Sequence, residues 1–214
     1  MKICISGPAV SGKTYFIQNL NYPFLFAYPE AARKVNNLRP DLVIDNYDLT
    51  VFRKKVCDFQ VNIESLGLDT DDNIHIFDRG IIDNLVFLSL QGDKNFTEEL
   101  SRTVELYRNG IIKPYDYIFY FDISPFDVIT PLLKTALNDP LRKATIDINN
   151  FRQHIVDFRN TFIDIVNFLN LSKKVIVQTA YLDEEGYDKR NEAVKDFILR
   201  IYTKGGYVYE NDNS

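Results

Sequence analysis

The stretch Gly7-Pro8-Ala9-Val10-Ser11-Gly12-Lys13-Thr14 matches the pattern G-x-x-x-x-G-K-[ST] at every fixed position. Residues 2–6 before it form an apolar run typical of a buried strand, and residues 15–20 after it have the apolar spacing of a helix. A strand, a glycine-containing loop and a helix in this order are the context of a phosphate-binding loop, or P-loop. The sequence therefore predicts a nucleoside triphosphate site at the first β–α junction.

Each part of this loop has a physical task in the predicted site. Glycines let successive backbone N–H groups turn toward one anion, and the start of the following helix adds further unpaired N–H groups. Lys13 is expected to reach the β- and γ-phosphates, and the Thr14 hydroxyl is expected to bind Mg²⁺. We therefore expect ATP and Mg²⁺ as cofactors. The nucleotide is expected to contact Gly7, Pro8, Ala9, Val10, Ser11, Gly12, Lys13, Thr14 and Tyr15.

Composition narrows the class of protein. The 214 residues, 45% hydrophobic and 26% charged, fit one α/β domain with a sizeable core. The formal net charge of -5 disfavours nucleic acid as a partner without excluding a local basic groove. Cys4 and Cys57 imply no disulfide framework, which indicates a reducing cytoplasm. No signal peptide and no membrane-spanning helix are expected, because the apolar runs are far shorter than about 18 residues.

Strands and helices are predicted to alternate along the chain, which is typical of a parallel sheet with helices on both faces. We expect a single domain over residues 1–204, with a mobile acceptor region at about 36–72, a lid at about 138–147 and a flexible tail at 205–214. The predicted strands are 2–6, 23–28, 74–77, 117–121 and 175–177. The predicted helices are 15–20, 30–35, 52–66, 81–90, 95–108 with an Asn95–Glu98 cap, 148–169 and 189–202.

Charged and polar residues follow the predicted strands although the strands themselves are apolar. Glu30, the pair Asp78-Arg79, Asp122 and the pair Gln178-Thr179 all come at strand ends. Ligands of open parallel sheets bind at the carboxyl ends of the strands. We therefore expect these side chains to face the ligand.

Asp78 and Arg79 are the first pair of candidates for catalysis. Asp78 can hold Mg²⁺ through water or accept the proton of an acceptor hydroxyl, and its alternative role is a cap for the helix at 81–90. Arg79 can clamp a phosphate bidentately, and its alternative role is an ion pair with Asp78 alone. The adjacent acidic and basic residues at a ligand-facing edge favour function.

Glu30 is the second candidate base, at the start of a predicted helix. Its alternative role is a favourable charge in the first helical turn. Arg33 lies one turn later on the same side and can orient Glu30 or bind the acceptor. Arg142 and Lys143 lie in a proline-bounded stretch that is either a basic lid over the phosphates or a solvated surface pair. Arg159 is expected at the surface, and His75 and His154 are expected to be structural.

Four segments resemble one family in matching order: GPAVSGKT (7–14), YPEAAR (28–33), IFDRGIID (76–83) and PYDYIFYFD (114–122). Together they resemble the AAA-type P-loop kinase family that includes NadR-like nicotinamide riboside kinase domains. They are similar, more distantly, to deoxynucleoside and thymidylate kinases. The resemblance spans roughly residues 1–180. It implies a five-stranded parallel sheet of order 2-3-1-4-5, a magnesium–ATP site and a lid.

The resemblance also implies roles for single residues. It implies that Glu30 is the base toward the acceptor hydroxyl, and that Asp78 and Arg79 bind metal-bound water and substrate. It implies that Arg142 is the lid arginine that contacts phosphates, although the dense arginine pattern of the family's lid is missing here.

We therefore predict an ATP-dependent kinase that transfers the γ-phosphoryl group to a hydroxyl or phosphate of a nucleoside, nucleotide or related ribosyl compound. Two alternatives stay open: a regulatory P-loop NTPase that switches a protein partner, and a kinase that acts on a modified base in DNA. A homodimer is also kept open. The predicted catalytic residues are Lys13, Glu30, Asp78, Arg79 and Arg142; the acceptor residues are Glu30, Arg33, Asp78 and Arg79; the metal ligands are Thr14 and Asp78.

Overall fold

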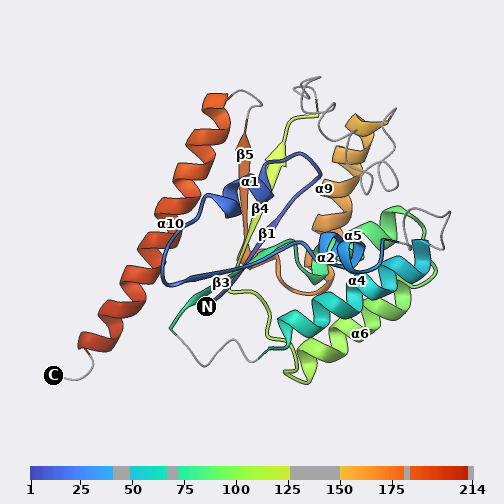
Figure 1. Cartoon of the computed structure of the whole chain (residues 1–214), viewed down its shortest axis with the longest axis horizontal. Helices are drawn as coiled ribbons and strands as arrows, with labels where there is room; N and C mark the ends of the chain where they lie inside the picture. The colour runs from blue at the N-terminus through green and yellow to red at the C-terminus, as the bar shows by residue number, and fades with distance from the viewer. Residues whose placement is uncertain (41–48, 67–71, 126–149, 181–183, 212–214) are drawn as a thin grey trace.

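The computed structural model describes residues 1–40, 49–66, 72–125, 150–180 and 184–211. Five parallel strands form one sheet in the order β2-β3-β1-β4-β5, as predicted (Figure 1). The strands are β1 (Lys2–Ser6), β2 (Leu25–Tyr28), β3 (Ile74–Asp78), β4 (Tyr117–Ile123) and β5 (Val175–Ala180). β1 is central, so the segments that leave β1, β3 and β4 meet at one edge of the sheet.

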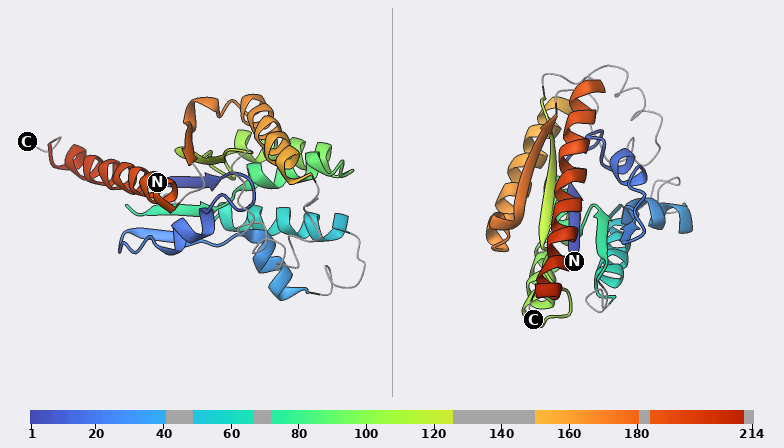
Figure 2. Two further views of the ribbon diagram at one scale, coloured as in Figure 1. Left: turned by 90° about the horizontal axis from the view of Figure 1, so that it is seen from above. Right: turned by 90° about the vertical axis from the view of Figure 1, so that its left-hand side faces the viewer.

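Helices cover both faces of this sheet, as predicted (Figure 2). α1 and α10 pack on one face, while α4, α5, α6 and α9 pack on the other. α2 packs against α4 in a small cluster of its own. The helices are α1 (Lys13–Gln18), α2 (Ala31–Leu38), α4 (Leu49–Glu64), α5 (Ile81–Leu90), α6 (Phe96–Arg108), α9 (Phe151–Phe168) and α10 (Glu184–Asn211), with a short 3₁₀ helix at Ser172–Lys174.

The central strands are apolar on both sides because both of their faces are buried. Ile5 and Phe121 belong to the core beneath α1 and α10. Cys4 and Tyr120, one residue away in each strand, belong to the core beneath α5 and α9. This alternation follows from the two-residue period of a strand. No helix within the described ranges is both long enough and apolar enough to cross a membrane.

The largest difference from the predicted elements is the length of α10. A helix was predicted for residues 189–202 with a flexible tail from 205, but the backbone is helical over Glu184–Asn211. The predicted tail began at Gly205. Glycine costs only about 1 kcal/mol in a helix interior, so a helix can pass through it. The last turns of α10 extend beyond the sheet (Figure 2).

The predicted cap of α6 is wrong. The Asn95 side chain makes no cap hydrogen bond, and Glu98 forms an ion pair with Lys54 at 3.1 Å. The Asp93 carboxylate accepts the Asn95 N–H at 2.9 Å instead. Smaller differences are that α2 continues to Leu38, where a loop was predicted from residue 36, and that β4 and β5 continue beyond their predicted ends.

Candidate functional site

The loop between β1 and α1 has the backbone of an anion cradle. Gly7 and Gly12 have φ angles of 137° and 82°, which only glycine adopts without strain. A Cβ atom on Gly7 would lie 2.5 Å from the carbonyl oxygen of Phe121, so a larger residue does not fit there. The non-glycine Val10 also has a positive φ, of 58°. The glycine positions of the motif are therefore required by the path of the loop.

Lys13 lies at the centre of this loop and is buried, with 5% of its surface exposed. Its ammonium group donates to the carbonyl oxygens of Gly7 and Pro8 at 2.9 and 2.6 Å, and to the Ser11 hydroxyl at 3.0 Å. Burial lowers the pKa of Lys13, and the neighbouring Arg79 lowers it further. A phosphate oxygen in the loop would replace these neutral acceptors by a charged one, which binds an ammonium group more strongly.

Thr14 and Asp78 form a direct contact between the P-loop and the end of β3. The Thr14 hydroxyl donates to Asp78 Oδ2 at 2.6 Å. Burial raises the pKa of Asp78, and the negative charge of Glu30 raises it further. Asp78 Oδ1 is buried and has no hydrogen-bond partner in the described part of the chain. Mg²⁺ takes few protein ligands and keeps phosphate and water oxygens in its coordination shell. The Thr14 hydroxyl and the buried Asp78 Oδ1 atom are oxygen ligands that suit this ion.

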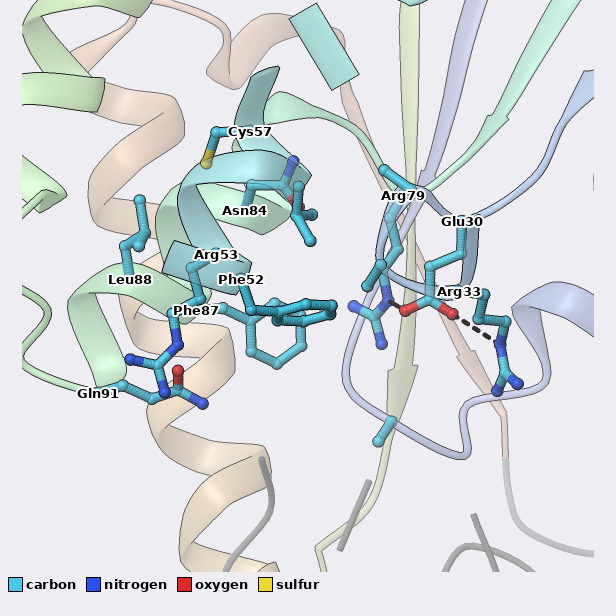
Figure 3. A pocket seen from close by; sticks show the side chains of 14 residues that line it. Glu30, Arg33, Phe52, Arg53, Cys57, Arg79, Asn84, Phe87, Leu88 and Gln91 are labelled. Atoms are coloured by element: carbon cyan, nitrogen blue, oxygen red, sulfur yellow. Dashed lines mark hydrogen bonds and ion pairs between the residues drawn. The ribbon is translucent and has the colours of Figure 1, made fainter. Parts of the chain in front are cut away.

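Arg79 joins the P-loop to the carboxylate of Glu30. Its Nε atom pairs with Glu30 Oε1 at 3.0 Å (Figure 3). Its Nη1 atom donates to the Gly7 carbonyl at 2.9 Å. Arg33 Nε pairs with the other oxygen of Glu30, also at 3.0 Å. Glu30, Arg79 and Lys13 are therefore linked through the single carbonyl of Gly7.

The alternative role considered for Arg79, an ion pair with Asp78 alone, does not match its contacts, because Arg79 pairs with Glu30 and Asp83. Successive residues of a strand point to opposite faces of the sheet. Asp78 continues the face that carries Ile76 and contacts Thr14 of α1. Arg79, with a φ of 68°, lies on the opposite face over the ring of Phe87, with 5.0 Å between guanidinium carbon and ring centre.

Asp83 is a site residue that the sequence reasoning missed. It is fully buried, accepts hydrogen bonds from the Ser6 hydroxyl at 2.9 Å and the Gly80 N–H at 3.1 Å, and pairs with Arg79 Nη1 at 3.2 Å. Burial raises the pKa of Asp83, and the Arg79 charge opposes that shift. The available signal was an acidic residue, Asp83, in the first turn of the helix that follows Arg79.

A pocket opens beside this cluster between α2, α4 and α5. Glu30, Arg33 and Arg79 lie at one end, and Arg53 and Gln91 lie at the other (Figure 3). The aromatic side chains of Phe52 and Phe87 supply apolar walls between the two ends. An apolar pocket with a few converging polar groups is the usual form of a small-molecule site.

Two buried nitrogen atoms of this pocket lack partners within the described residues: Asn84 Nδ2 and Arg53 Nε. Arg53 is held by an ion pair with Asp93 at 2.9 Å. Buried donors without partners are rare in proteins and costly. These two donors are therefore available for hydrogen bonds to a molecule in the pocket.

Other predicted residues lie apart from this pocket. Arg159, expected at the surface, pairs with Asp122 through Nε at 3.0 Å and Nη2 at 2.6 Å, so the carboxylate at the end of β4 has a structural partner. His75 contacts the Tyr28 hydroxyl at 3.1 Å, and His154 packs near Phe151 and Phe158. Arg142, Lys143 and the predicted lid at 138–147 lie outside the described residues, as do 41–48 and 67–71 of the predicted acceptor region.

The comparisons with known proteins agree with this fold. The family model described as AAA domain matches residues 2–156. A crystal structure of NadR protein in complex with NR aligns with a TM-score of 0.59 and 19% identity, covering 91% of this chain. The chain spans about half, 49%, of that NadR chain. A deoxyadenosine kinase from M. mycoides with bound dCTP aligns with a TM-score of 0.53 and 18% identity, covering 94% of this chain and 100% of the other. No curated protein sequence matches the chain.

Proposed function

The chain belongs to the AAA domain family, and on that premise we propose that it is an ATP-dependent kinase for a nucleoside, a nucleotide or a related ribosyl compound. One observation carries the proposal: a chain of contacts from Glu30 through Arg79 and the Gly7 carbonyl to Lys13 joins the pocket to the P-loop. An acceptor in the pocket would thus lie beside the terminal phosphate of ATP. Two structural neighbours, NadR in complex with NR and a deoxyadenosine kinase, support an acceptor of nucleoside type.

In this proposal Glu30 is the general base. Glu30 lines the pocket, whereas the buried Asp78 accepts the hydroxyl of Thr14 on the opposite face of the sheet. A carboxylate has about four lone-pair sites, so Glu30 can keep its bonds to Arg33 and Arg79 and still accept the proton of an acceptor hydroxyl. The hydroxyl oxygen then attacks the γ-phosphorus, the bond to the β-phosphate oxygen breaks, and ADP leaves.

Positive charge around the moving phosphoryl group comes from Lys13 and Arg79. Arg79 is held from two sides by Glu30 and Asp83, so its guanidinium group needs little reorganisation during the reaction. Thr14 and Asp78 would hold Mg²⁺, which would neutralise part of the phosphate charge. Free, buried Cys4 and Cys57 support the cytoplasm as the location.

The substitution Glu30→Gln tests the proposed base. We expect kcat to fall by about 10²–10⁴-fold, the usual contribution of a general base, while ATP still binds. ATP consumption is measured over a panel of nucleosides, nucleoside monophosphates and nicotinamide riboside, and ATP affinity by calorimetry. The matched control is Glu98→Gln, because Glu98 is exposed and pairs with the exposed Lys54, and Lys13→Ala is the variant that should lose ATP binding.

Three results would contradict parts of the proposal. Unchanged turnover by Glu30→Gln would remove Glu30 from its role as base. Acceptor-independent ATP hydrolysis that a protein stimulates would favour the regulatory NTPase. Phosphorylation of a DNA base, with no activity on the small-molecule panel, would favour the polymer-directed kinase.

A further inference from the structure

Arg190, in the first part of α10, is buried against the P-loop although it is 179 residues away in the sequence. It has 3% of its surface exposed. Its Nη1 atom donates to the carbonyl oxygen of Ser11 at 2.8 Å, and its Nη2 atom donates to Asn191 Oδ1 at 3.2 Å. The Ser11 carbonyl thus receives a charged, directional donor from outside the loop.

The guanidinium group is also held in position by an aromatic ring. Its carbon atom lies 3.9 Å from the centre of the Phe121 ring in β4. The same ring packs edge-on against Phe16 of α1, with 5.2 Å between ring centres. The carbonyl group of Phe121 is the group that leaves no room for a Cβ atom at Gly7. Arg190 therefore contacts a core residue that touches both the start of the P-loop and the helix after it.

The bond from Arg190 has a consequence for the next N–H group of the loop. A trans peptide is planar, and its C=O and N–H groups point in opposite directions. While Arg190 holds the Ser11 carbonyl toward α10, the Gly12 N–H must point away from α10. No group within the described residues accepts a hydrogen bond from the Gly12 N–H. This donor is therefore available to a ligand in the loop.

We infer that Arg190 is a positioning residue for the phosphate-binding loop, which orients the Ser11–Gly12 peptide so that the Gly12 N–H donates to a phosphate oxygen of the nucleotide. The inference rests on the proposed nucleotide site. It concerns the binding of the polyphosphate alone and does not depend on the nucleobase or on the acceptor. Arginine suits this position because its planar guanidinium group can stack on Phe121 and still direct an N–H to Ser11.

Arg190→Met tests this role, because methionine keeps an apolar chain over Phe121 and removes the donors. Loss of one oriented donor to phosphate should weaken binding of ATP and of tripolyphosphate by about tenfold, measured by calorimetry. The KM for the acceptor should stay unchanged. Arg190→Lys should restore much of the lost affinity, since an ammonium group can still donate to Ser11. Arg200→Met is the matched control, because Arg200 is exposed on the same helix and, among the described residues, donates to the Asp196 carbonyl of its own helix.

A second measurement follows the Gly12 amide itself. In protein labelled with ¹⁵N-glycine, tripolyphosphate should shift the Gly12 resonance strongly in the wild type and in Arg200→Met, and weakly in Arg190→Met. If Arg190→Met does not fold, Arg190→Lys takes its place, with an intermediate shift expected.

The outcomes separate this inference from the proposed function. If the wild type binds neither ATP nor tripolyphosphate, the proposed function and the inference are both wrong. If the wild type binds both and the Arg190 variants bind equally well, only the inference is wrong. An equal loss of nucleotide and acceptor affinity would show general destabilisation and would also overturn it.

Discussion

Asp78 beside the P-loop is a buried acidic residue that lowers the stability of the fold and has a proposed role in binding Mg²⁺. Asp78 is 3% exposed and forms its one described hydrogen bond with Thr14. Its pKa is raised, first by burial and then by Glu30. The native chain therefore holds a proton on Asp78 at pH values where the unfolded chain has lost it. The free energy of unfolding falls as pH rises through this window, which begins at the unfolded pKa near 4.

We predict that Asp78→Asn raises the melting temperature of the ligand-free protein at pH 7. The amide oxygen can still accept the Thr14 hydroxyl, and the buried charge is gone. Each kcal/mol corresponds to about 2–4 °C in a chain of this size. The rise in melting temperature relative to the wild type should become smaller as pH falls toward 4, because Asp78 in the wild type then becomes protonated. Thermal scans at pH 7 and pH 4 measure it, with exposed Asp164→Asn on α9 as control; a lower melting temperature at pH 7 would contradict the prediction.

Two of the helices beside the pocket, α4 and α5, are tied to the sheet by one buried carboxylate. Glu64, near the end of α4, accepts the Ile81 N–H at the start of α5 at 2.9 Å and the hydroxyl of Tyr115. Its other oxygen lies 2.8 Å from the ammonium group of Lys2 in β1. Neither side chain of that ion pair is more than 6% exposed. This contact positions α4 and α5, and with them the aromatic walls of the pocket.

We predict that Glu64→Ala is strongly destabilising, because it leaves the Lys2 charge buried without its partner. Breaking a buried ion pair in this way costs about 3–5 kcal/mol. Urea unfolding followed by circular dichroism measures the loss. Glu105→Ala, an exposed position on α6, is the control for the change of residue type. A loss below about 1 kcal/mol, the range of surface pairs, would show that Lys2 and Glu64 are solvated.

In the whole molecule, α10 contributes to the fold through its first two-thirds. Val194 and Ile198 of this helix are fully buried, and its Tyr202 stacks on Phe24 with 3.7 Å between ring centres. The later turns extend past the sheet (Figure 2).

We predict that a chain ending at residue 203 keeps the melting temperature and the ATP affinity of the full chain. A chain ending at residue 193 should not fold, because it loses these core contacts. A lower melting temperature for the chain ending at 203 would show that the later turns stabilise the fold.

The order of strands and helices and the P-loop could be predicted because their signals are local. The glycines and Lys13 act within eight residues, and apolar periodicity marks each strand and helix within a few turns. Glu30, Asp78 and Arg79 could be placed near one another because strand ends in a parallel sheet share an edge. The partners of these residues could not be predicted in the same way. Arg79 pairs with Glu30 and Asp83 rather than with adjacent Asp78, since the pleat of β3 separates neighbours.

The amino-acid sequence by itself determined the α/β fold and the anion cradle, because backbone conformation and hydrophobic periodicity are properties of short segments. Only the tertiary structure decided which distant side chains meet: Arg190 with Ser11, Glu64 with Lys2, and Arg159 with Asp122. These pairs are 37 to 179 residues apart. Their contacts depend on how helices pack across the sheet, and no local pattern encodes that packing.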